Sequence, residues 1–238
     1  MFFPVAVSQA SLATAIGLSA AGIWAATIPP NPSPDKVPAT GDSIRLAVTI
    51  QQKYGNILYL SLGAAAFHYI SLVLTYPTIP ESLLRNASVN GLKTSFVTWS
   101  KDTAVPLAFI LVGASLRLLS YRALGGNFTF GLSEPDHLNT TGLYRYMQHP
   151  SYTGALAMVG GVLGLWGRVD GVLSCFLPPR LFSELRRLEP GFLSLAFVSA
   201  VAVVSKRVKD EEMLLRGMFG SQWEAWHSRT ARFVPFIF

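Results

Sequence analysis

The chain has 238 residues, of which 50% are hydrophobic and 13% are charged, about half the charged share of an average soluble domain. The single cysteine excludes an intramolecular disulfide framework and a multi-cysteine metal site. A net charge of +6 would suit nucleic acid, but the basic residues are scattered between apolar blocks without an aromatic and basic stripe. The composition therefore indicates a membrane protein that contacts an anionic bilayer surface, and no nucleic-acid partner is expected.

Apolar residues gather in long blocks, and a helix that crosses a bilayer needs about 20 of them in succession. The first two blocks are long enough, and the third is long enough if Arg117 and Arg122 extend toward the interface. The last two are short and are expected to form a tilted or partly buried helix pair completed by polar flanks. The pattern predicts an all-α integral membrane protein with about five transmembrane helices, at residues 5–28, 56–76, 104–121, 152–166 and 192–205.

The first block is expected to be an uncleaved span, because it lacks a positively charged start and exceeds the apolar core of a signal peptide. A proline-rich connector follows at 29–38, and loops are expected at 77–103 and 167–191. If five helices cross the membrane, the loops 29–55 and 122–151 share one side with the C-terminal tail. That side holds eleven basic residues and the other loops hold seven. The positive-inside rule therefore predicts a multi-pass protein with a cytosolic C-terminal helical cap.

Glycines recur in the fourth apolar block. Gly160 and Gly164 are four residues apart, with Gly161 and Gly167 beside them. Small residues at this spacing let membrane helices approach closely, so a packing role is expected for them.

Polar groups concentrate in two segments, 122–154 and 206–238, which the predicted topology brings to the same membrane face. Ionisable groups at membrane depth are costly and often functional. These two segments are therefore the expected site.

In the second segment, Arg207 and Glu211 are four residues apart and share a helix face. Glu212 points about 100° away, so both carboxylates cannot face one site in an ideal helix. Trp223 and Trp226 are three apart on the next helical stretch. A solvated Arg–Glu pair and interfacial tryptophan anchors remain alternative interpretations of this segment.

In the first segment, His137 and His149 are twelve residues apart without a third ligand at helical spacing, so no metal is expected. Pro150 is expected to start the fourth helix in its first turn. The free amides of that turn would then lie beside Tyr144, His149 and Tyr152, which suits an anionic group.

The stretches "TGLYRYMQHPSYTG" (141–154) and "RVKDEEMLLRGMFGSQWEAWHSRTARFVPFI" (207–237) together resemble the isoprenylcysteine carboxyl methyltransferase family. The shared features are a His-Pro-Ser-Tyr element, an Arg-x-x-x-Glu-Glu element, a Phe-Gly pair and two spaced aromatic residues. The resemblance covers 122–238, and residues 1–121 match only in being membrane-spanning. It implies an N-terminal three-helix membrane region at 1–121. Residues 122–238 would form a methyltransferase core, with a helix pair and a C-terminal cofactor-binding tail.

The resemblance implies an enzyme of the endoplasmic reticulum membrane that uses S-adenosylmethionine to methylate the carboxylate of a C-terminal prenylated cysteine. Arg207 and Glu211 take the catalytic positions, and Arg207, Trp223 and Trp226 take the substrate-binding ones. The cofactor-binding positions fall on His137, Tyr144, His149, Pro150, Tyr152, Glu211 and Glu212. Implied partners are a prenylated protein C-terminus, or another lipophilic acceptor, and the lipid bilayer.

One position departs from the family pattern, because Gln148 stands where an arginine usually precedes His149. Glutamine can donate hydrogen bonds, but it lacks the charged fork of arginine. Three alternatives therefore stay open. The chain could methylate another lipophilic acceptor, such as a phospholipid amine or a small lipid acid. It could be a sterol reductase that uses NADPH, or an inactive membrane scaffold.

Overall fold

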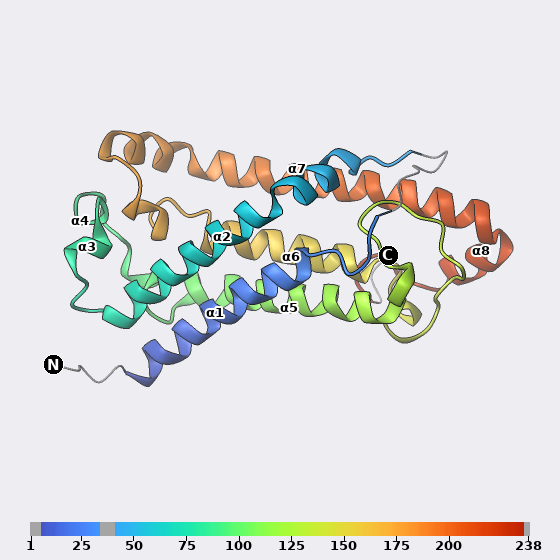
Figure 1. The fold of residues 1–238 in the computed structure, drawn as a ribbon, viewed down its shortest axis with the longest axis horizontal. Helices are drawn as coiled ribbons and strands as arrows, with labels where there is room; N and C mark the ends of the chain where they lie inside the picture. The colour runs from blue at the N-terminus through green and yellow to red at the C-terminus, as the bar shows by residue number, and fades with distance from the viewer. Residues whose placement is uncertain (1–5, 34–40, 236–238) are drawn as a thin grey trace. The chain divides into compact units, whose positions relative to one another are not determined.

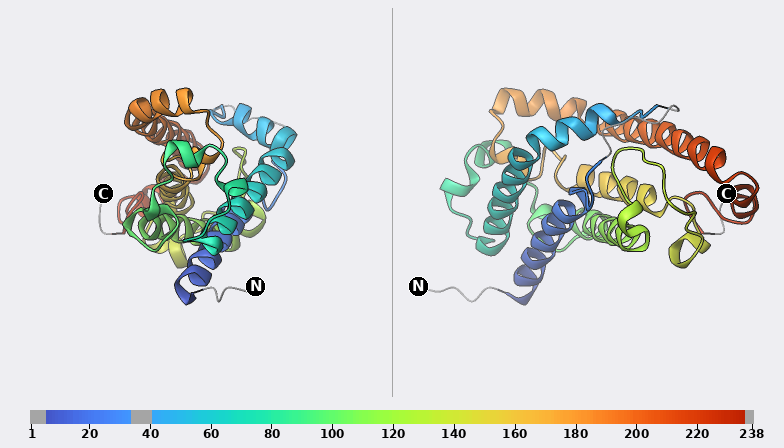
Figure 2. Two further views of the ribbon diagram at one scale, coloured as in Figure 1. Left: turned by 90° about the vertical axis from the view of Figure 1, so that its left-hand side faces the viewer. Right: turned by 45° about the vertical axis from the view of Figure 1, so that its right-hand side comes forward.

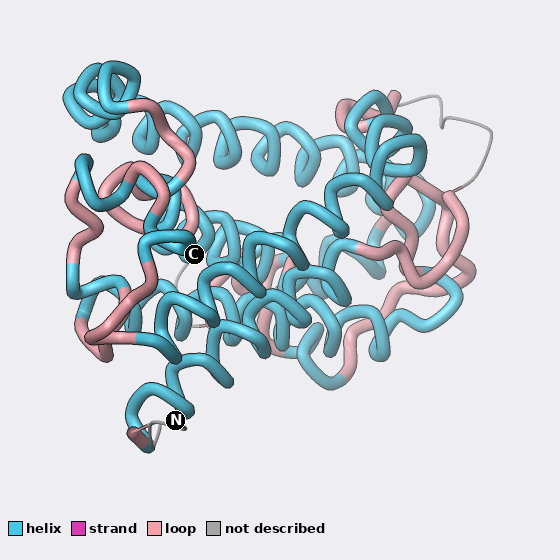
Figure 3. Tube along the Cα trace, turned by 60° about the vertical axis from the view of Figure 1, so that its left-hand side comes forward, coloured by secondary structure: helices cyan, strands magenta, loops and turns pink. Residues whose placement is uncertain are grey.

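A computed structural model describes residues 6–33 and 41–235 of the chain. These residues form helices and loops, and Figure 3 shows no strand among them. The order along the chain, from blue to red in Figure 1, is α1 (Val7–Thr27), α2 (Arg45–Thr75), α3 (Glu81–Leu84), α4 (Ala87–Asn90), η1 (Thr94–Phe96), α5 (Lys101–Leu124), η2 (Gly125–Asn127), η3 (Gly142–Arg145), α6 (Pro150–Leu165), η4 (Val172–Cys175), α7 (Pro179–Phe219) and α8 (Ser221–His227). The predicted all-α class is confirmed.

Four helical stretches in the described part of the chain are long and apolar enough to cross a membrane: Val7–Thr27, Arg45–Thr75, Thr94–Asn127 and Pro179–Phe219. The fourth apolar block forms the 16-residue α6, which is a shorter apolar helix. Side chains such as Leu60, Phe67 and Leu195 are 64–75% exposed, which suits contact with lipid tails. The chain is an integral membrane protein.

Two predicted boundaries were wrong. Helix α2 begins at Arg45 rather than near residue 56, and α7 begins at Pro179, so half of the expected loop at 167–191 is helical. The charged and polar residues in both extensions lower the hydropathy without opposing helix formation, because Arg, Lys, Gln and Glu are good helix formers. Part of the connector predicted at 29–38 lies outside the described residues.

The chain divides into two compact units, each assembled from three separate segments. The first consists of the described residues of Met1–Trp24, Ile57–Val112 and Ala157–Val198. Its core contains side chains that are less than 1% exposed, including Leu12, Tyr69, Ile110, Leu165 and Cys175.

Glycines of α6 make the close approach to α5 inside this unit. A Cβ atom on Gly161 would lie 2.6 Å from the carbonyl oxygen of Pro106, and one on Gly164 would lie 3.1 Å from the Pro106 ring. A Cβ on Gly160 would meet Phe197 at an ordinary 3.6 Å. The expected packing role therefore falls on Gly161 and Gly164, three residues apart.

The second unit consists of the described residues of Ala25–Asn56, Gly113–Leu156 and Ser199–Phe238. Gly220 has a φ of 48°, which ends α7 and turns the chain into the short α8 (Figure 2). Tyr144, Trp223 and Trp226 form a buried aromatic cluster between α8 and η3. Both polar segments identified in the sequence belong to this unit.

Candidate functional site

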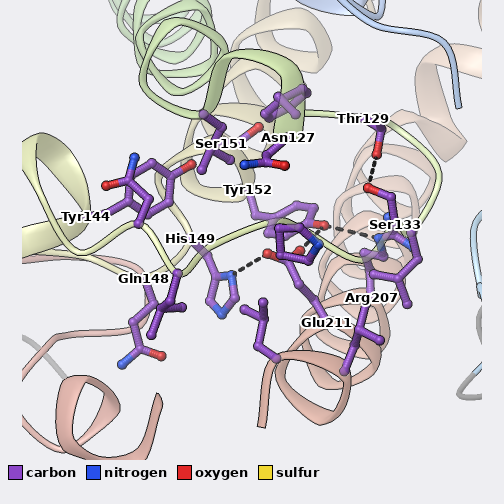
Figure 4. A pocket seen from close by; sticks show the side chains of 18 of the residues that line it. Asn127, Thr129, Ser133, Tyr144, Gln148, His149, Ser151, Tyr152, Arg207 and Glu211 are labelled. Atoms are coloured by element: carbon purple, nitrogen blue, oxygen red, sulfur yellow. Dashed lines mark hydrogen bonds and ion pairs between the residues drawn. The ribbon is translucent and has the colours of Figure 1, made fainter. Parts of the chain in front are cut away.

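A cavity of about 180 Å³ lies within the second unit. Its walls come from the end of α5, the segment that follows it, the start of α6, the C-terminal half of α7 and α8. Figure 4 shows side chains from these elements converging on it. Among the residues expected at the site, the cavity is lined by His137, Tyr144, His149, Tyr152, Arg207, Glu211 and Trp226. Pro150, Glu212 and Trp223 lie outside that lining.

The stretch before α6 is held in place by the C-terminal tail. The backbone amide of Gln148 donates to the carbonyl of Ala231 at 2.8 Å, and that of His149 donates to the carbonyl of Arg232 at 3.0 Å. The Thr153 hydroxyl donates to the carbonyl of Phe233 at 2.7 Å. Pro150 begins α6, as the sequence predicted. The tail therefore fixes His149 at the entrance to the helix, with its ring toward the cavity.

The hydroxyl group of Tyr152 joins the two segments that the sequence singled out. It donates to the Glu211 carboxylate at 2.7 Å and accepts from Nε of Arg207 at 3.1 Å. Arg207 and Glu211 thus lie on one face of α7, as their spacing predicted, and they meet a residue more than fifty positions earlier in the chain.

The ring of His149 lies between two neighbouring carboxylates. Its Nδ1 is 3.8 Å from Oε1 of Glu211, and its Nε2 is 3.3 Å from Oε1 of Glu212. The Glu212 carboxylate also pairs with Arg232 at 3.0 Å. Glu212 does point away from the cavity, as an ideal helix requires, but its length lets it reach the ring from the other side.

The buried Nδ1 of His149 has no hydrogen-bond partner among the described residues. Its side chain is 2% exposed. A buried polar atom without a partner costs about 1–3 kcal/mol. This nitrogen therefore favours a ligand that brings a hydrogen-bonding group into the cavity.

Arg207 has a partner that the sequence analysis missed. Its Nη1 lies 2.7 Å from Oδ1 of Asp42, and the two side chains are 3% and 1% exposed. Its Nη2 donates to the carbonyl of Phe130 at 3.0 Å. Asp42 also accepts the backbone amides of Ile44 at 3.1 Å and Leu132 at 2.9 Å. The residues just before α2 therefore supply the counterion of Arg207.

The two tryptophans of α8 have different surroundings. Trp226 lines the cavity and donates from its indole nitrogen to the carbonyl of Tyr144 at 2.8 Å. Trp223 is buried and stacks on His227, with ring centroids 4.3 Å apart. Burial raises the pKa of Tyr144 well above its usual value, so the phenol stays protonated. Trp226 therefore contacts the cavity, and Trp223 supports the tail.

Gln148 is 3% exposed, and its amide group binds the tail. Its nitrogen donates to the carbonyls of His227 and Thr230, and its oxygen lies 2.8 Å from Nδ1 of His227. Burial lowers the pKa of His227. The residue that departs from the family pattern thus helps to dock the C-terminal segment.

Comparisons with known proteins agree with this arrangement. Residues 102–200 match the family model described as phospholipid methyltransferase. The chain is 27% identical over 197 residues to protein-S-isoprenylcysteine O-methyltransferase A of Arabidopsis thaliana, covering 81% of this chain and 85% of that protein. The chain is thus similar to the isoprenylcysteine carboxyl methyltransferases, and these similarities support a membrane methyltransferase.

Two further relatives carry the same name in their descriptions. The chain is 29% identical over 138 residues to a probable protein-S-isoprenylcysteine O-methyltransferase of Oryza sativa subsp. indica, covering 56% of this chain. It spans 61% of the length of that rice protein. It is 22% identical over 213 residues to the protein-S-isoprenylcysteine O-methyltransferase of Rattus norvegicus, covering 79% of this chain and 67% of that protein. No solved structure matches the chain.

Proposed function

We propose that this protein transfers a methyl group from S-adenosylmethionine to the carboxylate of a C-terminal prenylated cysteine. The observation that supports the proposal is the single cavity lined by His149 and Tyr152 from one segment and by Arg207 and Glu211 from another. These are the residues on which the family resemblance depends, and Tyr152 joins Arg207 to Glu211 through hydrogen bonds.

The cavity suits a positively charged methyl donor. Among the described residues, the Glu211 carboxylate has no arginine or lysine within 4.0 Å and lies beside His149 and the hydroxyl of Tyr152. A carboxylate and aromatic rings stabilise a nearby cation. S-adenosylmethionine, when bound, supplies a methyl group on a sulfonium. We propose that Glu211 stabilises that charge, and that His137, Tyr144, His149, Pro150, Tyr152 and Glu212 hold the cofactor directly or by positioning each other.

The reaction requires alignment and no proton transfer. A carboxylate acceptor is ionised at neutral pH, so its oxygen forms a bond to the methyl carbon while the bond from that carbon to sulfur breaks and the electron pair stays on sulfur. The products are a methyl ester and S-adenosylhomocysteine. The residues have to hold the reacting atoms in line and exclude water. Arg207 and Trp226 are the proposed acceptor-side residues, with Trp223 behind Trp226.

A phospholipid amine is the second candidate acceptor, because the family model that matches 102–200 is described as phospholipid methyltransferase. An amine is protonated at neutral pH and must lose a proton before it can attack. A carboxylate avoids that step. The cavity also contains two arginines, Arg117 and Arg207, which suit an anionic acceptor better than a cationic one.

We place the enzyme in the endoplasmic reticulum membrane with its C-terminus in the cytosol. The excess of basic residues on that side of the predicted topology supports the orientation. A prenylated acceptor would reach the cavity from the lipid, and the donor would reach it from water. Residues 122–238 would thus act as the methyltransferase core and 1–121 as a membrane region.

The decisive test incubates membranes that contain the protein with methyl-labelled S-adenosylmethionine and either N-acetyl-S-farnesylcysteine or phosphatidylethanolamine. Label that base releases as methanol identifies a methyl ester, whereas methylated amine resists base. We expect ester formation from the prenylcysteine. Base-stable label on the phospholipid alone would reject the proposal in favour of the second candidate.

Arg207→Ala should abolish ester formation while the protein remains inserted in the membrane. The matched control is Arg216→Ala, because Arg216 lies on the same helix and its side chain is 66% exposed. Full activity of Arg207→Ala would remove the proposed role of that residue.

A further inference from the structure

Arg117 lines the cavity from α5, and its guanidinium contacts only neutral groups in the described part of the chain. Its Nε donates to the carbonyl of Ala26 at 2.9 Å, and its Nη2 donates to the hydroxyl of Tyr121 at 2.9 Å. Its Nη1 lies 3.2 Å from Oγ and 3.3 Å from the carbonyl of Ser151. Of the five N–H groups that a guanidinium carries, one on Nη2 is thus left without an acceptor among these residues.

No carboxylate of residues 6–33 or 41–235 lies within 4.0 Å of the Arg117 guanidinium. Arg207, the other arginine in the lining, is already paired with the buried Asp42 at 2.7 Å. Arg117 is partly buried, and a charge that is partly removed from water is normally paired or binds a ligand. Of the two arginines in the lining, Arg117 is therefore the one without an acidic partner among residues 6–33 and 41–235.

Within the part of the chain that the structure describes, the cavity wall carries an acidic group without a basic partner and a basic group without an acidic partner. Glu211 lacks an arginine or lysine partner in the described residues, and Arg117 lacks a carboxylate. Figure 4 shows Ser151, which contacts Arg117, on the opposite side of Tyr152 from Glu211 and Arg207. A cationic donor beside Glu211 and an anionic acceptor beside Arg117 would balance both charges within one cavity.

The surroundings of Arg117 suit a lipid-borne anion. Its guanidinium lies 5.4 Å from the ring centre of Phe130 and 5.6 Å from that of Tyr121. It belongs to the apolar stretch Thr94–Asn127, which is long enough to cross a membrane. His137 and His149, on the proposed donor side, lie outside that stretch.

We infer that Arg117 binds the carboxylate of the lipophilic acceptor, and that Arg207, neutralised by Asp42, positions Tyr152 and Glu211 instead of carrying the acceptor's charge alone. This inference rests on the proposed function. The acceptor's carboxylate is one possible source of such an anion, and the amino-acid carboxylate of the methyl donor is the other. Both present the same chemistry to a guanidinium, so the test must separate them.

The test measures equilibrium binding to the purified full-length protein in nanodiscs. The ligands are N-acetyl-S-farnesylcysteine and its carboxamide, palmitate and palmitamide, and S-adenosylhomocysteine. The wild type should bind each acid more tightly than its amide. Arg117→Gln should weaken acid binding on the order of tenfold to a hundredfold, the range of a hydrogen bond to a charged group. Binding of the amides should weaken by a smaller factor, because a neutral carbonyl lacks the negative charge of a carboxylate. Binding of S-adenosylhomocysteine should stay within about twofold, because the inference assigns Arg117 to the acceptor and not to the donor.

Two variants serve as controls. Arg122→Gln removes an exposed arginine from the same helix and should leave every affinity unchanged. Arg117 also donates to the Ala26 carbonyl at the end of α1, so Arg117→Gln removes a contact within the fold as well as the charge. Arg117→Lys keeps the positive charge but loses the paired N–H groups of the guanidinium. It should lower the preference for acid over amide about threefold or more, while thermal unfolding stays cooperative.

An unchanged preference for acid over amide in the Arg117 variants would overturn the inference. Loss of S-adenosylhomocysteine binding with acid binding intact would also overturn it, and would assign Arg117 to the donor. If the wild type binds neither farnesyl compound, the proposed function fails, and the palmitate and palmitamide pair still tests Arg117. The inference is also rejected if the wild-type protein binds the acid no more tightly than the amide in both the farnesyl pair and the palmitoyl pair.

Discussion

Replacing Asp42 with asparagine tests whether the buried ion pair with Arg207 is a structural requirement of the cavity. The substitution keeps the size of the side chain and one acceptor oxygen, and it removes the negative charge. Asp42 uses both carboxylate oxygens, one toward Arg207 and Ile44 and the other toward Leu132. In the variant, an amide NH₂ must face either the guanidinium or a backbone N–H, so two donors oppose each other.

The expected loss in the free energy of unfolding follows from the burial of both side chains. The side chains of Asp42 and Arg207 are 1% and 3% exposed, and removing one partner from a buried pair costs about 3–5 kcal/mol. We expect Asp42→Asn to lower the free energy of unfolding by about 3 kcal/mol, near the lower end, because one acceptor remains. The pair Arg216–Glu224 supplies the matched control, since its side chains are 66% and 53% exposed. Glu224→Gln should lower the free energy of unfolding by less than about 1 kcal/mol.

The assay is unfolding of the purified protein in mixed micelles by increasing amounts of SDS, with the free energy extrapolated to zero SDS. A cost for Asp42→Asn no larger than that for Glu224→Gln would refute the reasoning. The double variant Asp42→Leu with Arg207→Met removes both charges and should be more stable than Asp42→Leu alone, because it leaves no unpaired buried cation.

Three further predictions concern the packing and the tail. Gly161→Ala should lower the free energy of unfolding by about 1–3 kcal/mol, because its Cβ would overlap the Pro106 carbonyl, whereas Gly160→Ala should be tolerated. Gln148→Arg should alter the affinity for S-adenosylhomocysteine or the rate of methyl transfer, measured by calorimetry and turnover, because it replaces the amide that binds His227. Below a pH of about 6.5, the wild type should lose more thermal stability than His227→Gln.

The sign of the pH effect follows from the lowered pKa of His227. Burial is the main cause, the charge of Arg232 acts in the same direction, and that of Glu212 opposes it. Neutral His227 contributes fully to the free energy of unfolding at any pH above the pKa that it has in the unfolded chain. That contribution is lost as the pH falls through the lower pKa that it has in the folded protein. Equal pH dependence in wild type and His227→Gln would contradict this. Equal stability of the two glycine variants, or unchanged affinity and rate in Gln148→Arg, would contradict the other two predictions.

Much of the fold was predictable because long apolar runs and helix-starting prolines are local signals. The spans at the first three apolar blocks and the start of α6 at Pro150 came from such signals. The extents of α2 and α7 did not, because hydropathy reports the depth of a segment in the membrane and not the length of its helix. Charged residues such as Arg180 and Glu184 continue α7 without apolar character.

The candidate site was predictable where residues share a helix or a motif. The four-residue spacing of Arg207 and Glu211 predicted a shared face, and both contact Tyr152. Asp42 was missed because no periodicity relates it to Arg207, 165 positions away. The aspartate follows a glycine between α1 and α2, a pattern found in many turns. Only the folded chain brings these two charges together.

The attachment of the tail to the start of α6 has a consequence for biosynthesis. Residues 231–233 accept hydrogen bonds from Gln148, His149 and Thr153, yet the ribosome makes them after every described membrane-spanning helix. The segment that carries His149 cannot form these hydrogen bonds until more than eighty further residues have been synthesised. The wall of the cavity would thus be completed late during translation, once residues 231–233 have docked.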